Sequence, residues 1–343
     1  MAFERVPTYL SPTSVDQYFK SKREFVMHRL CKNRPPRWSQ TAPMAAGSAF
    51  DAYVKNYIVE NLYGKNHPYA EKFNLEKVLR SQVEPQNLDW ATEHGLWILS
   101  EYKRIGALAN LMKELAEAQD DPKFELEVQG DITFHGQLGA IPLLGKPDCC
   151  FKHKSGRYII DDWKVNGYCA SKMASPKGGW IRMMDVLGKQ IPPRKKVIMQ
   201  THEGILYNAG ARISSAWELQ VTIYGWLLGV PYGEPFFVGI EQLLGQGVKK
   251  PLRCASHRNL VMRDSQKDIA DKIMEVWAMV TNPEGEKIIF ADEEAQNNLE
   301  PGTIYEKLRI EGNAYLDEDQ AKEALEDGTS QGPNAEDWFQ RIR

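Results

Sequence analysis

Asp148, Asp162 and Lys164 lie near the middle of the chain with the types and spacing that a hydrolytic site requires. Asp162 and Lys164 follow an apolar run, and a short basic turn at residues 152–157 separates that run from Asp148. Residues two apart on a strand point to the same face, so we expect Asp162 and Lys164 to lie side by side. If the segments flanking the turn form a hairpin, Asp148 lies within reach across the sheet.

These residue types suit metal-dependent cleavage of a phosphodiester. Carboxylates hold Mg²⁺ or Mn²⁺, hard ions that prefer oxygen ligands. Such an ion polarises the phosphate and lowers the pKa of a bound water, while a lysine can orient that water or offset developing charge. The spacing alone leaves another interpretation open, in which Asp148 is a turn residue and Asp162 and Lys164 are an exposed pair on a strand.

Composition places the chain among ordinary globular proteins. The 343 residues, 42% hydrophobic and 26% charged, are enough for one large domain or two ordinary ones. No apolar run approaches the length of a membrane span, and residues 1–10 lack the apolar region of a secretory signal, so we expect a cytoplasmic protein with no membrane partner. The five cysteines are scattered and show no C-x-x-C spacing, which favours free thiols and argues against a zinc or iron–sulfur site.

The charge is unevenly distributed around a net value of −3. Acidic residues dominate beyond Asp292, and a solvated tail is the preferred interpretation there. A basic stretch lies in the middle of the chain and could track a nucleic-acid backbone, although a solvated loop is equally consistent with it. The candidate DNA-contacting residues in it are Lys172, Lys177, Arg182, Arg194, Lys195 and Lys196.

Hydrophobic periodicity predicts an α/β protein whose N-terminal region is helical. Helices are expected over residues 15–30 (with Ser14 as N-cap), 45–62, 89–118, 216–228 and 266–280. Strands are expected over residues 124–128, 131–134, on both sides of the hairpin, and over 235–243 and 251–261. We divide the chain into a helical region (1–120), a core (121–283) with a basic insertion near 167–215, and an acidic C-terminal tail (284–343).

Five short elements, in this order along the chain, resemble the PD-(D/E)XK nuclease superfamily, and within it the RecB-like branch that includes phage-type exonucleases. The resemblance implies a restriction-endonuclease-like core, with a central mixed sheet flanked by helices. The elements are Ser11-Pro12-Thr13-Ser14 with Tyr18, Gly47-x-x-x-Asp51, Gly145-x-x-Asp148, Asp162-Trp163-Lys164 and Gln220-x-x-x-Tyr224.

The resemblance also implies roles for single residues. Asp148 and Asp162 would hold Mg²⁺ or Mn²⁺ with the backbone carbonyl of Trp163, and Lys164 would lie beside the attacking water. Gln220 and Tyr224 share one helix face and would line the site. From the residues alone, that face could equally belong to an ordinary amphipathic helix.

Two departures from the family pattern matter. Asp51 stands where the family commonly has a histidine, so it is either an additional metal ligand or a helix-start acid favoured by the helix dipole. Some relatives hold an iron–sulfur cluster, but Ser21-Lys22 stands near the expected first cysteine and no cysteine follows Cys254. We therefore expect no cluster.

Three further residues are weaker candidates. Glu127 could approach the metal from the strand before the hairpin, or it could be exposed on an alternating strand. His153 in the turn and His202 in the insertion are expected to lie at the surface.

The residues and the resemblance together predict a Mg²⁺- or Mn²⁺-dependent DNA nuclease, most simply an exonuclease of recombination, repair or phage DNA metabolism. A structure-specific or nicking endonuclease, an RNA substrate, and a non-catalytic DNA-binding protein that retains the fold are the alternatives. Expected partners are DNA and a single-strand-binding or annealing protein, in a bacterial cell or a phage-infected host. Polarity and oligomeric state stay open.

Overall fold

The structure is a computed structural model that describes residues 7–30, 39–134, 139–165, 182–184, 190–191, 199–209, 211–213, 215–244, 253–296 and 300. The chain separates into two compact units that alternate along the sequence. The larger unit comprises residues 39–129 and 145–267, and the smaller one residues 1–38, 130–144 and 268–343. This division differs from the linear one expected from the sequence.

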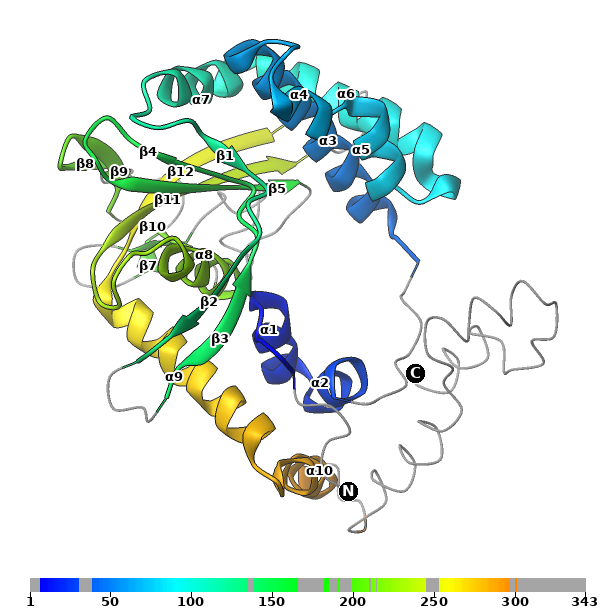
Figure 1. The fold of residues 1–343 in the computed structure, drawn as a ribbon, viewed down its shortest axis with the longest axis vertical. Helices are drawn as coiled ribbons and strands as arrows, with labels where there is room; N and C mark the ends of the chain where they lie inside the picture. The colour runs from blue at the N-terminus through cyan, green and yellow to red at the C-terminus, as the bar shows by residue number, and fades with distance from the viewer. Residues whose placement is uncertain are drawn as a thin grey trace. The chain divides into compact units, whose positions relative to one another are not determined.

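A five-stranded mixed sheet forms the centre of the larger unit (Figure 1). Strands β5 and β11 are parallel, and the other neighbouring pairs are antiparallel. The parallel pair requires a crossover, which helix α8 (Ser215–Leu227) supplies between β5 and β11 along the chain. In spatial order the strands are β1 (Lys123–Phe124), β4 (Cys149–Lys152), β5 (Tyr158–Val165), β11 (Phe236–Leu244) and β12 (Arg253–Val261).

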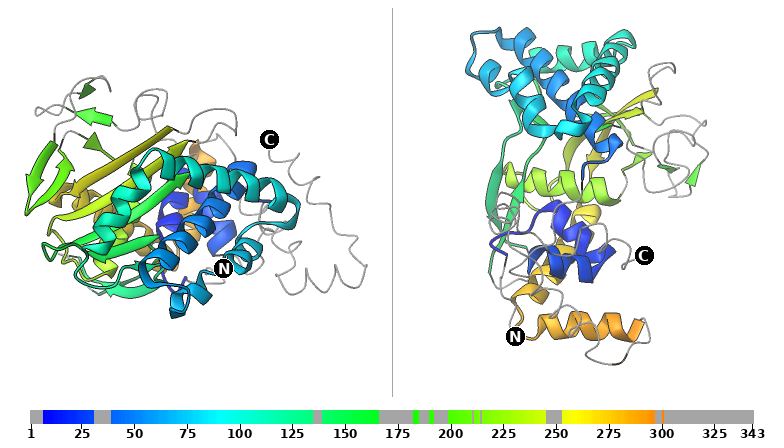
Figure 2. Two further views of the ribbon diagram at one scale, coloured as in Figure 1. Left: turned by 90° about the horizontal axis from the view of Figure 1, so that it is seen from above. Right: turned by 90° about the vertical axis from the view of Figure 1, so that its right-hand side faces the viewer.

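Helices cover both faces of this sheet. Seen from above, the helices of this unit between residues 42 and 116, coloured mid-blue to cyan, lie over the strands (Figure 2). The predicted α/β fold, with a central mixed sheet flanked by helices, is therefore confirmed. The helices on the N-terminal side are α3 (Ala42–Tyr63), α4 (Pro68–Lys72), α5 (Leu75–Gln82), the 3₁₀ turn η1 (Pro85–Asn87), α6 (Leu88–Arg104) and α7 (Ala107–Ala116).

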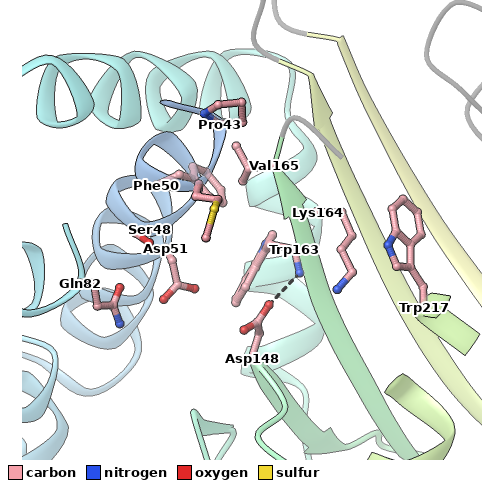
Figure 3. Close-up of a pocket in the computed structure, with 12 residues that line it drawn as sticks. Pro43, Ser48, Phe50, Asp51, Gln82, Asp148, Trp163, Lys164, Val165 and Trp217 are labelled. Carbon is pink, nitrogen blue, oxygen red and sulfur yellow. Dashed lines mark hydrogen bonds between the residues drawn. The ribbon is translucent and has the colours of Figure 1, made fainter. Parts of the chain in front are cut away.

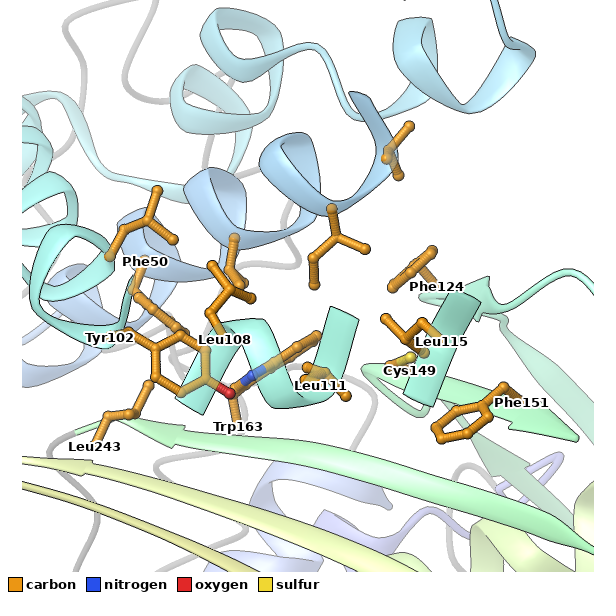
Figure 4. Packing of buried hydrophobic residues seen from close by; sticks show 14 of the residues in the cluster. Phe50, Tyr102, Leu108, Leu111, Leu115, Phe124, Cys149, Phe151, Trp163 and Leu243 are labelled. Carbon is orange, nitrogen blue, oxygen red and sulfur yellow. The ribbon is translucent and has the colours of Figure 1, made fainter. Parts of the chain in front are cut away.

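Two hydrophobic clusters hold the helices to the sheet. On one face, α3, α6 and α7 pack on apolar side chains of β4, β5 and β11, among them Phe151, Trp163 and Leu243 (Figure 4). On the other face, Val221 and Tyr224 of α8 pack among apolar residues of β5 and β11. A strand buried on both faces needs a nearly continuous apolar run, which explains the sequence before Asp161.

The predicted hairpin forms, and its register fixes the site. Cys149 pairs with Asp161 and Lys152 with Tyr158. Strand β5 continues past this point, so its last residues pair with β11 alone. Beyond the end of the β4 pairing, the Trp163 N–H donates to Asp148 Oδ2 at 3.0 Å. The first acid therefore accepts a backbone hydrogen bond from the strand that carries the second acid.

Two predicted helices are each broken into two. The helix expected over residues 89–118 ends at Arg104, and Gly106, with φ of 83°, starts the next one, a conformation that glycine adopts at little steric cost. The helix expected over residues 15–30 is interrupted at Ser21, between α1 (Pro12–Lys20) and α2 (Lys22–Arg29). Its N-cap is Ser11 rather than Ser14, because the two serines form a reciprocal capping box.

The smaller unit gathers segments from both ends of the chain. Tyr18 and Phe25 stack edge to face, and Lys22 lies 3.2 Å from Asp292. Helix α10 (Gly285–Gln296) occupies the start of the expected acidic tail, and the rest of that tail lies outside the described residues except for Glu300. Three elements contain a residue at which the chain passes from one unit to the other. They are helix α9 (Arg263–Thr281) and strands β2 (Val128–Ile132) and β3 (Ile141–Gly145), and the two strands pair as a two-stranded sheet.

Much of the predicted basic insertion lies outside the described residues, and the remainder consists of short strands. A tight turn joins β8 and β9 through Glu203 and Gly204, both with positive φ, as a two-residue hairpin of primed type requires. In the part of the chain that the structure describes, no helix has the length and apolarity that a membrane crossing needs. The short strands of the insertion are β6 (Arg182–Met184), β7 (Gln190–Ile191), β8 (Met199–His202), β9 (Ile205–Asn208) and β10 (Ala211–Arg212).

Candidate active site

Asp162 and Lys164 share the face of β5 that packs against α8. Lys164 Nζ lies 2.5 Å from Asp162 Oδ2, an ion pair by distance. The side-chain amide of Gln220 joins the two, since its oxygen accepts from Lys164 Nζ at 2.6 Å and its nitrogen donates to Asp162 Oδ1 at 3.1 Å. One glutamine thus fixes the orientation of both charged groups.

Tyr224 follows Gln220 by one helical turn. It is both a core residue of an amphipathic helix and a hydrogen-bond partner of the site. Its ring is buried in the apolar cluster under α8, while its hydroxyl accepts a hydrogen bond from Gln220 Nε2 at 2.9 Å. Gly145 allows the close approach, because a Cβ there would lie 2.6 Å from Tyr224 Cδ1. Burial holds the pKa of Tyr224 above its ordinary value, so the phenol is neutral.

Asp148 directly precedes β4 and faces a pocket of about 570 Å³ (Figure 3). Asp51 and Lys164 line the same pocket from α3 and β5. Trp217 lines it from α8, and the Lys164 ammonium lies 5.8 Å from the centre of a Trp217 ring. A charged substrate in this pocket would meet two carboxylates, an ammonium and an aromatic surface.

A buried lysine lies at ion-pair distance from the other carboxylates of the site. Lys55, only 1% exposed, lies one turn after Asp51 on α3. Its ammonium is 2.5 Å from Asp51 Oδ1, 2.8 Å from Glu125 Oε1 and 3.6 Å from Asp148 Oδ1. The second oxygen of Glu125 lies 2.7 Å from Lys146 Nζ.

Burial and ion pairing oppose each other in the protonation of these groups. Burial raises the pKa of Asp162 to about 6 against the nearby Lys164 charge, and that of Asp51 to about 7 against Lys55. Burial would lower the pKa of Lys55, but the three carboxylates around it raise that pKa above its ordinary value. For Glu125, Lys55 and Lys146 overcome burial and hold its pKa well below the usual range.

The structure decides two alternatives that the sequence left open for acidic residues. Asp51 is not a helix-start acid, because α3 begins at Ala42 and Asp51 lies in its interior. Glu127 is exposed, and Glu125 takes the place near the site that was considered for it. The reason is that β1 ends at Phe124 and Glu125 has φ of 46°, so the alternation expected from the sequence does not continue.

The structure thus brings together Asp51, Asp148, Asp162, Lys164 and Trp163 with the pair on α8. Sequence reasoning missed Lys55 and Glu125. The signal for Lys55 was its position four residues after an acid on a predicted helix, the spacing of a helical ion pair.

The other candidates lie elsewhere or outside the described residues. The expectation that His153 lies at the surface is wrong, because its side chain is buried in the hairpin turn with Nδ1 3.0 Å from Ser155 Oγ. The side chain of His202 is half exposed in β8, as expected. Arg182 belongs to β6, but its side chain is not among the described parts. Lys172, Lys177, Arg194, Lys195 and Lys196 lie outside the described residues.

The oxygen atoms around the pocket have the chemistry that a hard divalent ion prefers. Within the described ranges, however, no three acidic, histidine or cysteine side chains already form a metal cluster. The arrangement of charges explains this, because Asp51 and Glu125 converge on Lys55 while Asp162 pairs with Lys164. Asp148 and Asp162 are the residues that could hold such an ion beside the pocket.

Comparisons with known proteins add little. No family model and no curated sequence matches the chain. Among solved structures, a protein from Eubacterium rectale that carries a provisional exonuclease assignment is 13% identical, with 79% of this chain and 80% of that chain covered and a TM-score of 0.42. The protein SSO0001 is 11% identical, with 66% and 71% covered and a TM-score of 0.24. Likeness at this level carries no functional argument.

Proposed function

We propose that the protein is a divalent-metal-dependent DNA nuclease of the PD-(D/E)XK type. The observation that carries the proposal is the Asp162–Gln220–Lys164 network, which lies beside Asp148 at the wall of a pocket. A buried acid and a lysine joined by one amide is a costly arrangement, since each charge loses hydration. A catalytic role for these two charges at the pocket would explain why this costly arrangement is present.

Each residue has a separate task in this proposal. Asp148 and Asp162, with the Trp163 carbonyl, would hold Mg²⁺ or Mn²⁺, which when bound polarises the phosphate and acidifies a water. Lys164, whose ammonium faces the pocket, donates to the attacking water or to a phosphate oxygen. Gln220 keeps Asp162 and Lys164 in register, and Tyr224 holds the amide of Gln220 from the protein side.

An exonuclease acting in recombination, repair or phage DNA metabolism is the more specific form of the proposal. It rests on the five sequence elements that resemble the RecB-like branch. The basic residues at 172–196 would track the DNA backbone, and a single-strand-binding or annealing protein would present the substrate.

The test compares wild type with Lys164→Ala on end-labelled linear and closed circular DNA, in Mg²⁺, Mn²⁺ or EDTA. We expect metal-dependent cleavage of linear DNA and a loss of about 10²–10³-fold in the variant, the usual cost of removing one preorganised charge-stabilising donor. Absence of cleavage by the wild type, or equal cleavage by the variant, contradicts the nuclease and favours a non-catalytic DNA-binding protein. Cleavage of closed circular DNA would show that the enzyme is an endonuclease rather than an exonuclease. The same assay with RNA in place of DNA shows which polymer is the substrate.

A further inference from the structure

The buried ammonium of Lys55 is the part of the site that the proposed mechanism does not use. A lysine that is 1% exposed is rare, because an unpaired buried charge is costly. Lys55 avoids this cost by lying against Asp51 and Glu125, at 2.5 Å and 2.8 Å. The ammonium also lies 5.9 Å from the centre of a Trp163 ring, so the strand that carries Asp162 forms one wall around it.

The charges near Lys55 can be counted in two groups. When both acids are ionised, Asp51 and Glu125 carry two negative charges, and Lys55 and Lys146 carry two positive charges at ion-pair distance from them. This group is neutral and has no surplus charge to attract a cation. Lys55 also reaches Asp148 Oδ1, but at the longer distance of 3.6 Å. Asp148, Asp162 and Lys164 together carry a net charge of −1, which suits a single divalent ion.

We propose that Lys55 is a built-in counter-ion for Asp51 and Glu125, so that Asp51 is not a metal ligand and the site binds one divalent ion. The ammonium of Lys55 stands where a second cation would otherwise be needed to compensate the carboxylates of α3 and Glu125. Lys55 and Asp51 are then positioning residues. This inference rests on the proposed function, and it rejects the sequence expectation that Asp51 is a ligand.

Metal binding by the full-length chain tests the inference without reference to cleavage. Calorimetric titration with Mn²⁺ alone is run on wild type, Asp51→Asn, Asp148→Asn and Lys55→Met, with unfolding curves to establish that each variant is folded. Asparagine is nearly isosteric with aspartate, so Asp51→Asn and Asp148→Asn form a matched pair that differs only in which carboxylate is neutralised.

We expect wild type to bind one Mn²⁺ per chain, with affinity changed less than about threefold by Asp51→Asn and lowered at least about tenfold by Asp148→Asn, the smallest loss usual for groups that support a metal site. Lys55→Met should gain a second equivalent of Mn²⁺, because Asp51 and Glu125 lose their counter-ion. If Lys55→Met does not fold, the asparagine pair decides alone.

Two bound ions in wild type, a tenfold loss with Asp51→Asn, or a single ion in a folded Lys55→Met would each overturn the inference. The proposed function fails differently. If the wild type binds one ion but does not cleave DNA, the proposed nuclease function is contradicted and the proposed role of Lys55 still stands. If it cleaves DNA and binds two ions, the nuclease function is supported and the proposed role of Lys55 is contradicted.

Discussion

Asp161 and Asp162 are consecutive residues of β5, both 2% exposed, and they have opposite surroundings. Asp161 accepts from Arg258 Nη1 at 2.8 Å, and the other end of that guanidinium pairs with Glu114 of α7. Asp162 faces α8, where it meets Lys164 and Gln220 beside the pocket. The two faces of one strand thus carry a structural ion pair and a candidate active site.

Protonation behaviour alone does not distinguish these two aspartates. Burial raises the pKa of each to about 6, against the charge of Arg258 for Asp161 and of Lys164 for Asp162. The difference lies in the cation. Arg258 is a planar, permanently charged group held between two acids, whereas the Lys164 ammonium lies at the pocket wall where a substrate can reach it.

Replacing the cation on the structural face should produce the largest change in stability. Arg258→Met leaves Asp161 buried without a partner, so we expect a loss of about 3–5 kcal/mol in the free energy of unfolding. Gly239 is part of the same buried arrangement. It leaves room for the Asp161 carboxylate, because a Cβ at this position would lie 1.6 Å from Asp161 Oδ1. Urea denaturation measures the change, and cleavage per folded molecule should be unaffected.

The double variant Arg258→Met/Asp161→Asn is the control. Removing both charges should recover a large part of the lost stability, because the uncompensated carboxylate is the main cost. A double variant as unstable as the single one would mean that the guanidinium contributes packing rather than charge compensation.

On the face with α8, Gln220→Leu should affect activity more than stability. Without the amide, Lys164 and Asp162 lose their common partner, and we expect kcat/KM to fall about 10–100-fold, as for groups that orient metal ligands. Half-maximal activity should also require more Mg²⁺, which a merely structural role would not change.

Gln220→Glu provides the matched comparison. Glutamate keeps an acceptor for Lys164 but loses the donor to Asp162 and adds a negative charge. If leucine and glutamate reduce activity without moving the Mg²⁺ requirement, Gln220 acts on the substrate rather than through Asp162.

The fold was largely predictable because its signals are local. The apolar run before Asp161, the turn at residues 152–157 and the i, i+4 spacing of Gln220 and Tyr224 each depend on a few neighbouring residues. Periodicity did not reveal the break at Gly106, since the apolar pattern continues on both sides of it. The conformation of a single glycine decides that break.

Within the site, the sequence predicted which residues would be close but not how their charges would pair. Glu125 reaches Lys55 because of one residue with positive φ, and nothing in an alternating pattern indicates such a residue. Lys55 is 70 positions away from Glu125, so their contact depends on how α3 packs on the sheet. Long-range pairing of this kind follows from tertiary packing.

The smallest expected effect separates the two roles of Tyr224. Tyr224→Phe keeps the ring in the apolar cluster and removes the hydroxyl that accepts from Gln220, so the free energy of unfolding should change by only about 0.5–1.5 kcal/mol, one hydrogen bond. Activity should fall less than with Gln220→Leu, because Lys164 and Asp162 still hold the amide from the other side. Thermal unfolding and DNA cleavage are measured on the same samples, with Tyr224→Leu as the variant that also empties the ring site. A loss of activity as large as that of Gln220→Leu would show that the hydroxyl itself takes part in the reaction and is more than a support for the glutamine.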